Sequence, residues 1–213
     1  MKKETKQFFW PSYVDVMTAL FIIMLLLFIL SFKSLQDEKE NLVVRLEEKK
    51  YLEKIEESIK NLPQEYYVYQ EQYKRHTLRR QPRFGRGIAE ISSEEDIKYL
   101  IDAGKSLLEL ISKLKEKDTL GVTYLVILEG MASKDATPDD ENYKLSYRRA
   151  LALYNLWIKN NLNFNTDYLE LIFAGSGTGG IGRDESKEVN GVIDDSDNQK
   201  ILIQIIPKLG KVK

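Results

Sequence analysis

The sequence predicts a protein with one N-terminal transmembrane helix, a coiled-coil-like stalk and one α/β domain. A nearly unbroken apolar run, Tyr13–Phe32, has about the length that spans a hydrocarbon core of roughly 30 Å. A charged segment with apolar residues at heptad-like spacing follows at positions 34–62. From residue 84 onward, apolar runs of strand length alternate with helical patterns, which is typical of an α/β domain.

The composition excludes several classes of function. The chain has 213 residues, a formal net charge of −1, no cysteine and a single histidine, His76. Near-neutral charge gives no reason to expect a nucleic acid as partner. Without cysteine there are no disulfides, cysteine nucleophiles or thiolate metal sites, and one histidine argues against a histidine metal cluster. We therefore expect no cofactor and no metal.

The apolar run has the features of a retained membrane anchor. Its core is longer than the 7–15 residues of a signal-peptide h-region, and no small-x-small cleavage site follows it. Three lysines precede the run, whereas Lys33 beyond it is soon diluted by acidic residues. The positive-inside rule predicts a cytoplasmic tail at 1–9, a transmembrane helix at 10–33 and the remaining chain outside, in the periplasm of a bacterium.

Asp15 is the one ionisable residue within the apolar run. A carboxylate at membrane depth costs about 2.5–3.5 kcal/mol on insertion scales, and a helix that serves only as an anchor does not need one. Thr18, at i+3, shares its face of the helix, and Tyr13 lies at the membrane–water boundary. The alternative is a carboxylate that only favours the helix dipole near the N-terminus.

The segment 34–62 is predicted to be a helical dimer stalk. Leu52, Ile55, Ile59 and Leu62 alternate at spacings of three and four, which is the seam of a parallel coiled coil. The alternative is a single helix lying on its own domain. Pro63 is expected to end the helix.

Residues 63–83 are predicted to be a positively charged linker. Tyrosines are followed by basic residues, a composition that binds single-stranded nucleic acid in other settings. Outside the cell, contact with an anionic wall polymer or membrane surface fits better. The residues are Tyr66, Tyr67, Tyr69, Tyr73, Lys74, Arg75, Arg79, Arg80 and Arg83.

The α/β domain is predicted over 84–208, followed by a short tail at 209–213. We expect a first strand at 87–91 and a sheet covered by helices on one face. The other elements are helices at 93–117 and 142–160 and strands at 122–129, 169–173 and 200–206. The segment 175–197 is read as a flexible loop, because its glycines lack a Walker lysine and its acidic residues do not fit an EF-hand.

The membrane segment resembles the signature of the B subunits of ion-driven stators, which include flagellar MotB and the ZorB component of the Zorya anti-phage system. The residues that match are Trp10, Tyr13, Asp15, Met17 and Thr18. The resemblance implies that Asp15 carries the ion, with Thr18 and Tyr13 nearby. It also implies a dimer within a ring of multi-span A-type subunits (MotA/ZorA-like), and no enzymatic activity.

A second stretch resembles the core of OmpA-like peptidoglycan-binding domains. The residues that match are Asn142, Leu145, Ser146, Arg149 and Ala150. A guanidinium fork binds a carboxylate through two hydrogen bonds, and peptidoglycan stem peptides end in carboxylates. The resemblance implies that Arg149 faces this ligand and that Asn142 and Leu145 complete the site.

One departure from that pattern concerns the loop after the 122–129 strand. Where the family carries Thr-Asp after a glycine, this chain reads Gly130-Met-Ala-Ser133. Asp135, from a slightly longer loop, or Ser133, as a neutral contact, can take the place of that aspartate.

Together the two resemblances imply a wall-anchored B subunit of a rotary motor driven by ion-motive force, with a proton channel formed beside the A-type partner in the bacterial inner membrane. The short N-terminal tail and long acidic loop favour the ZorB branch and anti-phage defence. The alternatives are a flagellar MotB-like subunit and a passive OmpA-like envelope tether without transport. Asp15 and Thr18 discriminate, because a tether needs neither.

Overall fold

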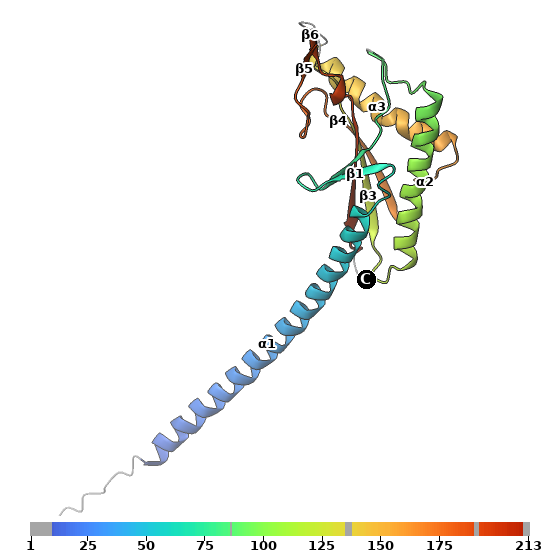
Figure 1. The fold of residues 1–213 in the computed structure, drawn as a ribbon. Coiled ribbons are helices and arrows are strands. Elements are labelled where there is room, and N and C mark those ends of the chain that lie inside the picture. Colours follow the sequence, from blue (N-terminus) through green and yellow to red (C-terminus); the bar gives the residue numbers. More distant parts are fainter. Residues whose placement is uncertain (1–9, 86, 135–137, 190–191, 211–213) are drawn as a thin grey trace, which may run out of the picture. The chain divides into compact units, whose positions relative to one another are not determined.

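The computed structural model describes residues 10–85, 87–134, 138–189 and 192–210. The chain divides into two compact units, 1–51 and 52–213. Helix α1 (Trp10–Lys60) provides the described part of the first unit (Figure 1). By length and composition it is long and apolar enough to cross a membrane, and the predicted span lies at its N-terminal end.

The last turns of α1 belong to the second unit, and they correct the predicted stalk. Ile55, Ile59 and Leu62 are only 2–5% exposed within this single chain, so the C-terminal part of the predicted dimer seam is covered by the chain's own domain. The regular helix ends at Lys60, three residues before Pro63. Leu35, Leu42 and Leu46, which lie on a rough continuation of the seam toward the membrane segment, remain exposed, and pairing of two helices along that part of the stalk stays a prediction.

The second unit contains a five-stranded sheet in the order β1-β2-β7-β3-β4. Strands β3 and β4 are parallel, and the other neighbours in this sheet are antiparallel. Its elements are β1 (Tyr67–Gln70), β2 (Arg75–Leu78), α2 (Glu94–Glu116), β3 (Thr123–Gly130), α3 (Asp139–Lys159), β4 (Leu169–Gly175) and β7 (Ile201–Lys208). A separate hairpin of β5 (Lys187–Val189) and β6 (Val192–Asp194), followed by the 3-10 turn η1 (Ser196–Asn198), lies within the segment predicted to be a flexible loop.

The predicted linker at 63–83 is wrong, because these residues form the β1–β2 hairpin at one edge of the sheet. Tyr67 is buried, and its hydroxyl donates to the carbonyl of Ala103 in α2 at 2.6 Å. Arg75 is also buried and forms an ion pair with Glu129 of β3 at 3.4 Å. The tyrosines and arginines are therefore parts of the folded domain. The expected strand at 87–91 is absent from the described residues 87–91.

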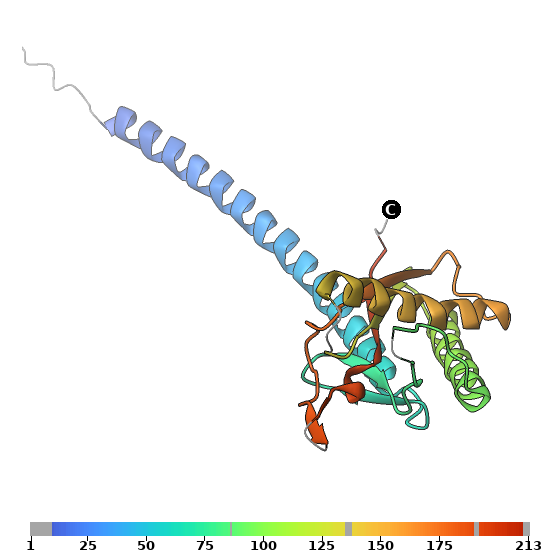
Figure 2. The ribbon, with the colours of Figure 1, turned by 90° about the horizontal axis from the view of Figure 1, so that it is seen from above.

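Helices α2 and α3 pack together over one face of the sheet, as predicted (Figures 1 and 2). Ser93 caps α2 by accepting a hydrogen bond from the Asp96 amide, as the sequence pattern predicts. The indole of Trp157 in α3 donates to the Leu100 carbonyl in α2 at 2.8 Å. Apolar side chains of the two helices and of alternate positions in β3 and β7 form the core, including Leu107, Ile111, Val126, Leu128, Leu153 and Ile203.

The single histidine, His76 of β2, is buried between two tyrosine rings. Its ring centroid lies 4.9 Å from that of Tyr69 and 6.1 Å from that of Tyr67. Neither ring nitrogen has a hydrogen-bond partner among the described residues. Burial lowers the pKa of His76 to about 4, although the nearby backbone carbonyls of Lys60 and Ile59, which do not meet hydrogen-bond geometry with the ring, act in the opposite direction. His76 is therefore neutral at physiological pH.

Replacing His76 by phenylalanine should remove an acid sensitivity of the fold. The imidazole has its ordinary pKa near 6.5 when unfolded and about 4 when folded, so the unfolded chain binds the extra proton first. Stability is lost as the pH falls between these values, by about 3 kcal/mol in total. Denaturant unfolding of wild type and His76→Phe at pH 7, 5.5 and 4 should show this difference. Parallel pH profiles for the two proteins would contradict it.

Candidate functional sites on α3 and in the membrane helix

The N-terminal half of α3 lies unusually close to the ends of β3 and β4. A Cβ atom on Gly130 would lie 2.0 Å from the Ser146 carbonyl oxygen, and one on Gly175 would lie 2.5 Å from the Tyr147 amide nitrogen. Only glycine permits this approach. The contact places the side of α3 that carries Asn142, Ser146 and Arg149 against the loops that follow the two strands.

Arg149 lies in the core of the domain and is 1% exposed. Its guanidinium donates to the carbonyls of Ile88 at 3.2 Å, Met131 at 3.3 Å and Gly85 at 3.5 Å. The ring of Phe84 lies 4.6 Å from the guanidinium carbon, a cation–π distance. Carbonyl dipoles and an aromatic face thus take the place of water around the charge.

This burial differs from the sequence-based expectation that Arg149 faces a ligand. Asn142 is also buried, at 2% exposure, and Leu145 is half-buried. The structure therefore brings the predicted residues together on one helix, but it places the two polar ones beneath the surface. The guanidinium is thus surrounded by protein groups, including the carbonyls of Gly85 and Ile88, and is not open to solvent.

The loop after β3 carries the residues predicted to replace the missing Thr-Asp pair. Ser133 is half-buried, and its hydroxyl oxygen accepts a hydrogen bond from the side-chain amide of Gln199 at 3.2 Å. Asp135 lies outside the described residues. Ser146, which matched the family pattern, has a structural role: its hydroxyl donates to the Tyr143 carbonyl and accepts from the Gly177 amide.

Sequence reasoning missed a charged cluster beside this loop. Asp195 is buried and accepts hydrogen bonds from the Ser186 hydroxyl, the Asn198 amide and the backbone amide of Lys134, and it pairs with Arg183 at 2.5 Å. Arg183 also donates to the Ala132 carbonyl at 2.9 Å. The cluster therefore ties the segment after β4 to the loop after β3.

The pKa of Asp195 shows that its charge is held within the fold. Burial raises the pKa, but the hydrogen bonds and the charge of Arg183 outweigh burial and hold the pKa below its ordinary value. The spacing of the acidic residues in this segment does not fit an EF-hand, and Asp195 is bound by donors of the protein itself. The sequence feature that could have indicated this charged cluster is Arg183, a basic residue that lies close in the sequence to several acidic residues.

In the membrane helix, Asp15 and Thr18 lie one turn apart and are exposed in the single chain. The Thr18 hydroxyl donates to the Val14 carbonyl at 2.8 Å. Its proton is thereby committed to the backbone, and the oxygen keeps its acceptor lone pairs. Tyr13 is exposed two residues before Asp15.

No protein-family model matches the sequence, and no curated protein sequence matches it. Similar solved structures include the OmpA-like domain of FopA1 from Francisella tularensis, at 19% identity and a TM-score of 0.37, covering 69% of this chain and 84% of that one. The periplasmic domain of Helicobacter pylori MotB has 16% identity and a TM-score of 0.35, covering 62% and 81%. An outer membrane protein from Borrelia burgdorferi has 21% identity and a TM-score of 0.34, covering 61% and 87%.

The burial of Arg149 predicts that its removal weakens the fold. Arg149→Ala leaves buried carbonyl oxygens without donors and a void under Phe84, so the free energy of unfolding should fall by about 2–4 kcal/mol. The adjacent, exposed Arg148 offers the matched control: Arg148→Ala should change stability by less than about 0.5 kcal/mol. Denaturant unfolding of the full chain in detergent measures both. Equal stability of the two variants would show that the guanidinium is dispensable for folding.

Proposed function

We propose that this chain is the wall-anchored B subunit of an ion-driven rotary stator. A dimer of the chain would lie within a ring of multi-span A-type subunits in a bacterial inner membrane, with the N-terminus in the cytoplasm and the α/β domain in the periplasm. Protons passing through Asp15 would turn the ring against the anchored dimer. The output we propose is Zorya-type anti-phage defence, with flagellar motility as the alternative output.

The observation that carries this proposal is Asp15 within the otherwise apolar run Tyr13–Phe32 of α1. A charged carboxylate at membrane depth is costly, and binding of a proton removes the charge. Thr18 adds a second oxygen on the same face, with its own proton directed to the Val14 carbonyl. The pair thus offers two acceptors to a passing cation, which a passive anchor does not need.

The α/β domain is the proposed wall anchor, through Asn142 and Arg149 of α3 and Ser133 of the loop after β3. The support is chemical: one helix carries a guanidinium fork and an amide, beside a loop that presents the Ser133 hydroxyl. The carbonyls that now surround Arg149 would be exchanged for the carboxylate of a peptidoglycan stem peptide. Because this exchange releases one set of hydrogen bonds to form another, we expect modest affinity for each site.

The ion-carrier role predicts that Asp15→Asn abolishes biological output. The asparagine keeps the shape and removes the charge, so membrane insertion should be unharmed and the complex with the A-type partner should purify with the same composition. Phage resistance or motility, whichever the host shows, should fall to the level of a gene deletion. Thr18→Ala should give a milder loss.

The matched control for this test is Asp37→Asn, which changes the same side chain on the same helix beyond the apolar run. It should leave output unchanged. A fully active Asp15→Asn protein would remove the ion-carrier role and leave the second candidate function, a passive envelope tether.

The wall-binding role predicts that Arg149→Lys weakens binding to purified peptidoglycan. Lysine keeps the charge but loses the planar fork, and losing one charge-assisted contact of about 1.5–3 kcal/mol lowers affinity roughly ten- to hundred-fold. Arg148→Lys is the control for general charge effects. Sedimentation with peptidoglycan gives the readout, and circular dichroism checks that both variants are folded. Equal binding by both variants would restrict Arg149 to its structural role.

A further inference from the structure

Strand β4 is an unprotected edge of the main sheet. The sheet order ends at β4, and within the described ranges no strand pairs with its outer side; the first residue of β4, Leu169, donates its amide to the Thr166 carbonyl of the preceding turn at 3.2 Å. Its seven residues, Leu-Glu-Leu-Ile-Phe-Ala-Gly, include no proline and no lysine. Edge strands that lack such residues, or a covering segment, are templates for pairing with another strand.

The backbone groups directed outward from β4 follow from its pairing with β3. Tyr124 lies opposite Leu169, and the Tyr124 amide donates to the Tyr168 carbonyl at 2.8 Å. In a parallel ladder alternate residues bond to the neighbouring strand. The N–H and C=O groups of Glu170 and Ile172 therefore face β3, while those of Leu171 and Phe173 face outward.

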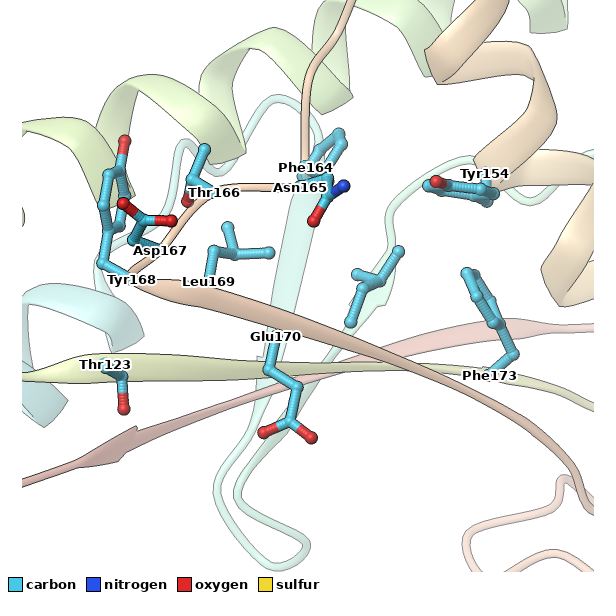
Figure 3. A pocket seen from close by; sticks show the side chains of 11 residues that line it. Thr123, Tyr154, Phe164, Asn165, Thr166, Asp167, Tyr168, Leu169, Glu170 and Phe173 are labelled. Atoms are coloured by element: carbon cyan, nitrogen blue, oxygen red, sulfur yellow. The ribbon is translucent and has the colours of Figure 1, made fainter. Parts of the chain in front are cut away.

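The side chains of β4 divide between the two faces of the sheet. Figure 3 shows Leu169 and Phe173 on the side of Tyr154, with Glu170 pointing to the opposite side. The Tyr154 and Phe173 rings lie 4.9 Å apart. Ile172, on the Glu170 side, is 40% exposed. A cavity of about 470 Å³ beside the strand is lined by Tyr154, Phe164, Thr166, Leu171 and Phe173 among others.

We propose that two copies of this chain pair through β4, antiparallel to each other, around a two-fold axis at Ile172. This register is self-complementary, as an isologous interface requires. Leu171 lies opposite Phe173 of the partner subunit, and each of these residues directs its N–H and C=O outward. On either side of the axis, Leu171 of one copy and Phe173 of the other therefore exchange two backbone hydrogen bonds. Ile172 lies opposite the partner subunit's Ile172 between these two pairs.

The charges along β4 agree with a second copy as the occupant. Glu170 lies opposite Ala174 of the partner subunit, so the two Glu170 side chains are separated by about 13 Å along the strands. Glu170 is also paired with Lys208 of its own chain at 3.1 Å. No like charges meet in this register, and the exposed Ile172 side chain becomes covered.

The same two-fold axis also brings the α3 helices of the two copies toward each other. Tyr147, Tyr154 and Ile158 recur at helical spacing, and Tyr154 shows that this side of α3 faces the β4 edge. Tyr147 and Ile158 are more than 40% exposed. A two-fold axis perpendicular to the sheet places both α3 helices on one side, where these stripes face each other.

The pairing deepens the proposed dimeric stator subunit and rests on that dimer. It supplies a contact outside the membrane, where the α1 seam from Ile55 onward is covered by the chain's own domain. The contact is independent of ion transport, so the two proposals fail separately.

The test uses cysteine cross-linking, because the chain contains no cysteine. Opposite residues in a non-hydrogen-bonded pair have Cα atoms about 4.5 Å apart, within the range of a disulfide. Full-length Ile172→Cys in membranes, treated with a mild oxidant, should become mostly a disulfide-linked dimer on a non-reducing gel. Glu170→Cys, on the same strand and face, is the matched control and should stay at background, since its counterpart is too distant.

Strong cross-linking at 172 but not at 170 supports the proposal. Absence of a cross-linked product at position 172, or equal products at both positions, overturns the proposal. Absence of a product is also the result expected if another extended peptide, and not a second copy, pairs with β4. The double variant Asp15→Asn, Ile172→Cys should cross-link as fully as Ile172→Cys alone. Ile172→Glu should lower the dimer fraction of the full chain in detergent, measured by sedimentation; an unchanged dimer fraction contradicts the interface.

Discussion

The close contact of α3 with the ends of β3 and β4 is the constraint on which the α/β domain depends. Gly130 and Gly175 leave no room for any side chain between strand and helix. The helix therefore settles deep enough to put the Arg149 guanidinium in the core. Burying a charge is severely unfavourable unless hydrogen-bond partners surround it, and backbone acceptors are among the partners of Arg149. The carbonyls of Gly85 and Met131 are two of these acceptors.

Arginine side chains that donate to backbone carbonyls hold the loops at this end of the sheet. Arg149 binds the segment before α2 and the loop after β3, while Arg183 binds the same loop through the Ala132 carbonyl. Arg75, from β2, donates to the Ile181 carbonyl at 2.5 Å and so holds the glycine-rich segment after β4. Strand β2, helix α3 and the segment after β4 thus contribute one arginine each, and these side chains hold segments that have little regular structure. The acceptors are backbone atoms, so the sequence of the loops can vary around them.

The sequence predicted the parts of the fold that local patterns determine. The cap at Ser93, the apolar run of β3 and the match around Arg149 all depend on spacing within one segment. The β1–β2 hairpin escaped prediction because Arg75 is neutralised by Glu129, which lies 54 residues away. The α1 seam was ambiguous for a physical reason: Ile55 and Ile59 show the same spacing whether they meet a second helix or their own domain. Asp195 was missed because its partners come from three different segments.

Two ionisable residues, Asp15 and Arg149, differ in whether the described residues of their own unit supply hydrogen-bond partners for them. Arg149 has carbonyl acceptors and an aromatic ring within its own domain, and these groups stabilise its charge. Asp15 has no hydrogen-bond donor among the described residues of this chain, and the neighbouring Thr18 directs its proton to the Val14 carbonyl. A single helix cannot satisfy a carboxylate in an apolar medium. The proposed ion-carrier role of Asp15 therefore depends on the neighbouring helices that the proposed assembly would supply, whereas Arg149 has acceptors within the α/β domain itself.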